Sequence, residues 1–165
     1  MLAPIETEMN LIVRDKPGLL KFLTELAEVR TSRIAFNYYG KPEDATFYVR
    51  IEQREDSSGI VTRFVTAKGS FVSDDGINQR KEVTLTIPED ADDDYKAFLE
   101  VVGLKPRDIK TKTRHAFKIN DLDVTLDEWD TSELGDRLEI EGSDITAIQE
   151  FASKLKQFCD DTPSE

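Results

Sequence analysis

The chain has 165 residues and a formal net charge of −12. This length fits one domain with a hydrophobic core, and no apolar run approaches the roughly 20 residues of a membrane-spanning helix. The negative charge would repel nucleic-acid backbones and anionic membranes, so we expect neither as a partner. The segment from Met1 to Arg14 lacks a secretory signal and the single Cys159 cannot form an internal disulfide, so we expect a cytoplasmic protein.

The first half of the chain is expected to form strands around one helix. Polar and apolar side chains alternate over residues 4–14, which is the period of a strand with one charged face. Asp15 and Pro17 then open a helix whose apolar residues recur at the spacing of a core-facing stripe. Further strands, separated by turn residues, are predicted at 31–39, 46–54, 60–68 and 79–87.

The second half of the chain continues this pattern. An acidic run precedes a helix predicted over residues 91–102, as the positive end of a helix dipole favours. Strands are then expected at 108–119, 121–129 and 136–142, with a hairpin at Asn120-Asp121 and a last helix from about Ser143. We expect one domain over residues 1–159 and a disordered acidic tail over residues 160–165.

The polar faces of these strands carry acidic and basic side chains two residues apart. These faces are Glu6/Glu8/Asn10, Arg50/Glu52/Arg54, Lys68, Arg80/Glu82/Thr84, Lys110/Lys112/Arg114, Asp123/Thr125/Asp127 and Arg137/Glu139/Glu141. One interpretation is a sheet with one solvated face and helices on the other. The alternative is an α+β fold in which about eight antiparallel strands close into a barrel with the charged faces inward and about three helices outside.

The closed barrel would place two kinds of ligand group together. Lys and Arg side chains suit phosphate oxygens, whereas Glu and Asp suit a hard divalent ion such as Mg²⁺ or Mn²⁺. The residues of the charged faces therefore describe a site for a metal-bound polyphosphate.

Seven short motifs follow one another between residue 5 and about residue 142. They are Glu6-Thr7-Glu8-Met9-Asn10, Val49-Arg50-Ile51, Thr66-Ala67-Lys68-Gly69, Arg80-Lys81-Glu82, Lys112-Thr113-Arg114, Leu126-Asp127, and Leu134-Gly135 with Leu138-Glu139-Ile140-Glu141. In this order the motifs resemble those of the CYTH superfamily of triphosphate tunnel metalloenzymes. That superfamily takes in class IV adenylate cyclases, thiamine triphosphatases and inorganic triphosphatases.

The resemblance implies an eight-stranded antiparallel tunnel and a role for each charged face. The carboxylates implied to hold one or two Mg²⁺ or Mn²⁺ ions are Glu6, Glu8, Asp127, Glu139 and Glu141. The cations implied to bind the phosphates and assist catalysis are Arg50, Lys68, Arg80 and Arg114, with Lys112 as a further candidate. The implied ligand is a triphosphate or nucleoside triphosphate, and the implied assembly is a monomer or a homodimer.

Several positions depart from the family pattern. Asn10 replaces a lysine of the first motif, and Glu52 stands where a second phosphate-binding arginine is usual. Thr84 replaces an acid, and Arg137 stands where an aromatic or apolar residue is common. The sequence therefore leaves open two functions: metal-dependent processing of a triphosphate, by hydrolysis or cyclisation, and binding of a polyphosphate or phosphorylated ligand without turnover.

Other residues are given structural interpretations. His115 falls on the face opposite Lys112 and Arg114, so we expect it to pack outside the site. The aromatic residues Phe36, Tyr38, Tyr39 and Trp129 are interpreted as packing or interface residues, with stacking on a base as the alternative for Tyr38 and Tyr39. No glycine-rich nucleotide-binding motif follows a strand.

Overall fold

The computed structural model describes residues 5–41, 44–131, 133 and 135–161. The first strands and helix are β1 (Ile5–Val13), α1 (Lys16–Leu26), β2 (Arg30–Lys41), β3 (Asp44–Asp56) and β4 (Val61–Asp74). Then follow β5 (Ile77–Ile87), α2 (Asp92–Val101), β6 (Lys105–Ile119), β7 (Leu122–Trp129), β8 (Arg137–Glu141), α3 (Ile145–Lys154) and β9 (Cys159–Asp161).

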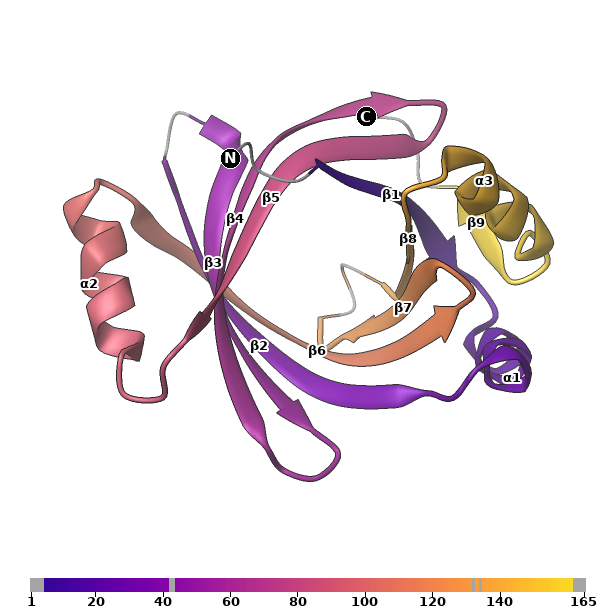
Figure 1. The fold of residues 1–165 in the computed structure, drawn as a ribbon, viewed down its shortest axis with the longest axis horizontal. Coiled ribbons are helices and arrows are strands. Elements are labelled where there is room, and N and C mark those ends of the chain that lie inside the picture. The colour runs from indigo at the N-terminus through magenta and orange to yellow at the C-terminus, as the bar shows by residue number, and fades with distance from the viewer. Residues whose placement is uncertain (1–4, 42–43, 132, 134, 162–165) are drawn as a thin grey trace.

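Eight strands form a closed antiparallel barrel (Figure 1). Neighbouring strands follow the order β5-β4-β3-β2-β6-β7-β8-β1, and an additional pairing between β5 and β1 closes the ring. In that pairing Glu6 lies opposite Arg80, whereas Glu8 lies opposite Glu141 where β1 meets β8. The closed barrel of the α+β alternative is thus confirmed, and the open sheet is wrong.

Two hydrophobic clusters cover the outside of the barrel. The larger one packs α1 and α3 against the wall and includes the fully buried Leu23, Leu138 and Ile148. The smaller one packs Leu99 of α2 on strand residues that include Tyr39. Figure 1 shows α2 on the opposite side of the barrel from α1 and α3. No helix among the described residues is long and apolar enough to cross a membrane.

Local signals read from the sequence account for the ends of these elements. The Asp15 carboxylate accepts a hydrogen bond from the Gly18 backbone N–H at 3.0 Å and caps α1, and Asp144 caps α3 in the same way. Asn120 has a φ of 54°, the left-handed conformation that the tight turn between β6 and β7 requires. The predicted helix starts and the hairpin are confirmed.

The predicted tail is wrong at its first two residues. Asp160 and Asp161 belong to β9, where they pair with Ile12 and Leu11 of β1. The buried Cys159 anchors this strand to the larger hydrophobic cluster, which is why the chain stays ordered there. Residues 162–165, and Leu134 of the last motif, lie outside the described residues.

Candidate functional site

A cavity of about 530 Å³ lies among the side chains that the barrel strands direct inward. Its lining is mostly charged and includes Glu6, Glu8, Arg50, Glu52, Arg54, Lys68, Arg80, Glu82, Lys112, Arg114, Asp127, Arg137, Glu139 and Glu141. All ten residues that the CYTH resemblance singles out are in this set. The structure therefore brings together in one cavity residues that are up to 135 positions apart in the sequence.

Strand periodicity explains why these side chains reach the cavity. On β3, Val49 and Ile51 are buried in the cluster beneath α2, together with Leu99. Arg50 and Glu52 alternate with them and line the cavity. Because successive side chains of a strand point to opposite faces, burial of the apolar positions outside directs the charged positions inward.

One wall carries a group of residues that we call the Asp127 group: Lys112, Arg114 and Asp127. Arg114 donates two hydrogen bonds to Asp127, from Nε to Oδ1 at 2.6 Å and from Nη2 to Oδ2 at 2.7 Å. Lys112 donates to Oδ2 of the same carboxylate. Burial alone would raise the pKa of Asp127, but hydrogen bonds from Arg114 and Lys112 outweigh it and hold that pKa below its ordinary value.

The predicted metal ligand Asp127 is therefore engaged by two cations. Lys112 itself is 2% exposed, and burial, followed by the nearby charge of Arg114, lowers its pKa to about 8. Burial would also lower the pKa of Arg114, yet hydrogen bonding to Asp127 and the charge of Glu139 raise it. Asp127 thus fixes the direction in which the Arg114 guanidinium faces.

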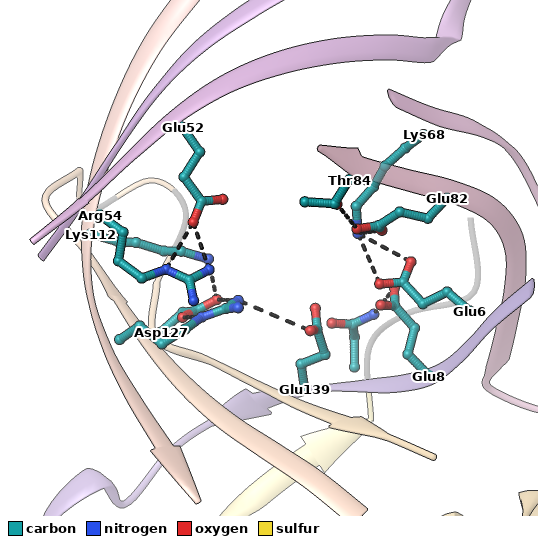
Figure 2. Close-up of polar contacts among 12 residues, drawn as sticks. Glu6, Glu8, Glu52, Arg54, Lys68, Glu82, Thr84, Lys112, Asp127 and Glu139 are labelled. Carbon is teal, nitrogen blue, oxygen red and sulfur yellow. Dashed lines mark hydrogen bonds and ion pairs between the residues drawn. The ribbon is translucent and has the colours of Figure 1, made fainter. Parts of the chain in front are cut away.

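The opposite wall carries a second group, which we call the Glu6 group: Glu6, Glu8, Lys68, Arg80 and Glu82. Lys68 Nζ lies 3.1 Å from Glu6 Oε1 and 2.5 Å from Glu82 Oε2. Arg80 contacts Glu6 at 2.9 Å through Nε and Glu8 at 3.1 Å through Nη2. Figure 2 shows Glu6, Glu8, Lys68 and Glu82 on one side and Lys112 and Asp127 on the other, with Glu139 between them.

A third feature is the acidic contact between β1 and β8. Glu8 lies directly opposite Glu141, and Asn10 lies opposite Glu139. Burial, followed by the charge of Glu139, raises the pKa of Glu8 to about 7. Burial and the charges of Glu6 and Glu139 likewise raise the pKa of Glu141 to about 7. Burial and neighbouring negative charges both disfavour the ionised form of these carboxylates, so they bind protons more tightly than usual.

A divalent ion would require several carboxylate oxygens of this β1–β8 contact to approach one point. No three Asp, Glu, His or Cys side chains of the described residues are close enough together to hold a metal ion as they stand. However, Glu8 Oε2 is buried without a hydrogen-bond partner among the described residues. A buried carboxylate oxygen of this kind is a suitable ligand for Mg²⁺ or Mn²⁺, so the donor chemistry of Glu8 fits such an ion.

Aromatic rings support the cations of the Asp127 wall. Lys112 Nζ lies 5.0 Å from the centre of the Phe36 ring and 4.7 Å from that of Trp129. The Arg50 guanidinium lies 4.7 Å from the Phe36 ring centre. Such contacts stabilise a cation that has lost much of its hydration. Tyr38 and Trp129 also line the cavity, a position compatible with the stacking alternative given for Tyr38, whereas Tyr39 packs in the cluster beneath α2.

His115 lies outside the cavity, as its strand parity predicts. Its Nδ1 is 3.1 Å from Thr31 Oγ1, and its Nε2 is 2.7 Å from Glu128 Oε1. Glu128 also accepts a hydrogen bond from Lys16 at the start of α1. His115 therefore belongs to a polar contact between the barrel wall and α1.

Sequence reasoning gave no site role to several lining residues. Glu82 appeared in a charged face and in the motif Arg80-Lys81-Glu82, and Arg54 appeared in a charged face beside Glu52. Each forms an ion pair in the cavity. Strand parity was a sufficient signal for both. Tyr48 and Phe64 also line the cavity. Their inward direction follows from the registers of β3 and β4, which pair Tyr48 with Lys68 and Glu52 with Phe64.

Comparison with solved structures identifies proteins of the same architecture. The PH1819 protein from Pyrococcus horikoshii OT3 is 26% identical, with a TM-score of 0.71 over 91% of this chain and 86% of that chain. HpAC1 from Hippeastrum, a protein with a dominant triphosphatase activity, is 11% identical, with a TM-score of 0.69 over 97% of this chain and 92% of that chain.

A chain of the Schizosaccharomyces pombe Mediator head module has the same architecture. It is 11% identical, with a TM-score of 0.75 over 95% of this chain and 97% of that chain. No protein-family model and no curated protein matches the sequence.

The chain is thus a closed antiparallel barrel with external helices and with acidic and basic side chains around a cavity. Among solved structures this architecture is shared with adenylate-cyclase-like and triphosphatase proteins. The chain therefore shares its fold with these proteins, as the motif resemblance to the CYTH superfamily predicts.

Proposed function

We propose that the protein binds a triphosphate-containing substrate in the barrel cavity and processes it with the help of a divalent ion. The observation that carries this proposal is the meeting of all ten motif residues around one cavity. Hydrolysis of the triphosphate and cyclisation of a nucleotide are both compatible with this lining, since they differ mainly in whether water or a ribose hydroxyl attacks.

The cations would bind the phosphate oxygens from two sides. Arg114 is held in place by Asp127, and Arg80 by Glu6 and Glu8. Guanidinium groups fixed in this way can pair with phosphate oxygens without a large loss of side-chain entropy. Lys68 and Arg50, which also line the cavity, would add positive charge near the phosphoryl group that is transferred.

Glu8, Glu139 and Glu141 would hold the divalent ion. When bound, Mg²⁺ or Mn²⁺ would neutralise charge on the phosphates and help to orient them for attack. Glu8 and Glu141 would release protons on binding it, since their pKa values are raised to about 7. Their cross-strand arrangement brings the three acidic groups together along β1 and β8, with Glu139 4.0 Å from Arg114 of the Asp127 group.

Binding without turnover is the second candidate function. Asn10 and Glu52 favour it, because both remove a positive charge that the family pattern would place near the substrate. The similarity to a chain of the Mediator head module also indicates that such a barrel occurs in a protein assembly. The two candidates share the cavity and differ only in whether a product appears.

Titration calorimetry combined with a product assay tests both candidates. Tripolyphosphate and ATP are titrated with and without Mg²⁺ or Mn²⁺, while released phosphate and cyclic nucleotide are measured. We expect metal-dependent binding that is weakened at least about tenfold by Arg114→Ala and by Glu139→Ala, since each removes a charge from the cavity.

The matched control is Arg33→Ala, because Arg33 pairs with Asp130 on the exposed surface and is absent from the cavity lining. It should bind like the unaltered protein. Product formation supports the enzyme, and saturable binding without product supports the binding protein. Equal weak binding of tripolyphosphate and sulfate at matched ionic strength would contradict both candidates.

A further inference from the structure

We propose that the Glu52 carboxylate is a built-in anion that occupies part of the phosphate-binding site and thereby determines which anions the cavity accepts. The inference rests on the proposed function, because it assumes that phosphates bind among the cations of the cavity. It goes further by assigning Glu52 a role in specificity, at a position where the family pattern has an arginine.

The contacts of Glu52 are those of a bound anion. Its Oε1 accepts hydrogen bonds from Arg54 Nε at 3.0 Å and Nη2 at 2.6 Å, and its Oε2 lies 3.7 Å from Arg50 Nη2. The negative charge of Glu52 also contributes to raising the pKa of Arg114. Guanidinium groups converging on one carboxylate form the arrangement that would otherwise receive a phosphate.

Burial strengthens the electrostatic interactions between Glu52 and the arginines. Glu52 is only 2% exposed, so water screens its interactions with the arginines poorly. Figure 2 shows the carboxylate reaching from its strand to Arg54 above Asp127 and Lys112. A phosphate that enters this part of the cavity must therefore share the arginines with Glu52 or displace it.

In the cavity lining as a whole, acidic and basic residues also balance one another. Among the described residues that line the cavity, seven are acidic and seven are basic. A bare triphosphate would add several negative charges to a cavity with no formal positive excess, which is unfavourable in a poorly screened site. A phosphate ligand that carries its own divalent ions would add much less net charge. We infer that Glu52 makes the cavity selective for the metal-bound form of the ligand.

Removing the charge of Glu52 should relax this selectivity. In Glu52→Gln the side chain keeps nearly the same shape, while one negative charge disappears from among the arginines. We expect tripolyphosphate to bind Glu52→Gln at least about tenfold more tightly than the unaltered protein when EDTA removes divalent ions. With saturating Mg²⁺ the difference should shrink to less than about threefold, because the ions already neutralise the ligand.

The matched control is Glu55→Gln on the same strand. Glu55 is exposed and is absent from the cavity lining, so its loss should leave both affinities unchanged. A second variant, Glu52→Gln with Arg54→Gln, restores the charge balance. It should bind bare tripolyphosphate as weakly as the unaltered protein.

Thermal unfolding provides a readout that does not depend on a stable Glu52→Gln variant. If Glu52 acts as a resident anion, added sulfate should raise the melting temperature of Glu52→Gln more than that of Glu55→Gln, since sulfate can occupy the vacated position. Equal responses to sulfate, together with equal affinities in EDTA, would overturn the inference.

The outcomes separate this inference from the proposed function. Metal-dependent binding by the unaltered protein, with no gain in Glu52→Gln, leaves the proposed function standing and overturns the role of Glu52. Loss of metal-dependent binding in Glu52→Gln would make Glu52 a metal ligand and would also overturn it. If neither protein binds tripolyphosphate under any condition, both proposals fail.

Discussion

Asn10 shows how a single side chain bears on the chemistry of the cavity. Its Nδ2 donates a hydrogen bond to Glu8 Oε1 at 3.0 Å, and in the ladder it lies opposite Glu139. The amide therefore reaches the carboxylates proposed to hold the metal, but it brings no charge. A lysine at this position would place an ammonium group beside the same acids and near the attacking water.

We accordingly expect Asn10→Lys to raise phosphate release from tripolyphosphate by about tenfold or more, since a positioned proton-transfer group contributes about 10²-fold or more in enzymes. Malachite-green detection of phosphate at several pH values would measure it. Asn37→Lys, which adds the same charge outside the cavity lining, should leave the rate unchanged. Equal rates in the two variants would show that the missing lysine does not limit turnover.

At the scale of elements, the contact between β1 and β8 combines a stabilising apolar face with a destabilising charged face. Leu11 and Leu138 face each other in this ladder and are buried in the larger hydrophobic cluster. On the inward face of the same two strands, Glu8 and Glu141 face each other instead. Like charges directly opposite in a ladder are destabilising, so the apolar face must offset this cost.

The raised pKa values predict how stability depends on pH without metal. Glu8 and Glu141 have folded-state pKa values of about 7 against an ordinary value of 4.5, so between these limits the folded state binds more protons than the unfolded state. The free energy of unfolding should therefore fall as pH rises through this window, by on the order of 2 kcal/mol for each of the two groups.

Urea unfolding in EDTA at about pH 5.5 and about pH 8 would measure this difference. The lowered pKa of Asp127 acts in the opposite direction, but its contribution is lost only at more acidic pH. The double variant Glu8→Gln with Glu141→Gln should flatten the dependence. A stability that rises over this range in the unaltered protein would contradict the prediction.

At the scale of the whole molecule, the hydrophobic core lies outside the barrel rather than within it. The larger cluster lies between the wall and the helices α1 and α3, and the smaller one lies beneath α2. Because the apolar clusters and the charged cavity lie on opposite faces of the same strands, the core can stabilise the ring while the cavity retains costly buried charges.

Leu138→Ala should therefore destabilise the entire protein although it leaves the cavity lining untouched. Leu138 is fully buried, and removing such a side chain costs about 2–5 kcal/mol. Leu85→Ala is the matched control, since Leu85 is 54% exposed on β5 and should cost less than about 1 kcal/mol. Denaturant unfolding of both variants measures this, and equal losses would contradict the location of the core.

The sequence by itself determined most of the elements and which charged residues share one face of a strand. Alternation along the strands is a local property, so it placed Arg50 and Glu52 on one face and Val49 and Ile51 on the other. The capping residue Asp15 and the turn residue Asn120 are equally local, and both were recognised from the sequence. The CYTH motif order added the expectation of a closed barrel.

Only the tertiary structure decided how these faces meet. Closure through β5 and β1 sets Glu6 opposite Arg80, and the other registers leave Glu8 facing Glu141. Periodicity fixes the side of a strand but not its partner, so neither pairing could be read from the chain. The pairing of Asp160 with β1 also depends on contacts between distant segments. The burial of Glu52 and its electrostatic interaction with Arg114 of β6 likewise depend on the closed barrel, whereas its neighbours Arg50 and Arg54 on the same strand face were visible from the alternation.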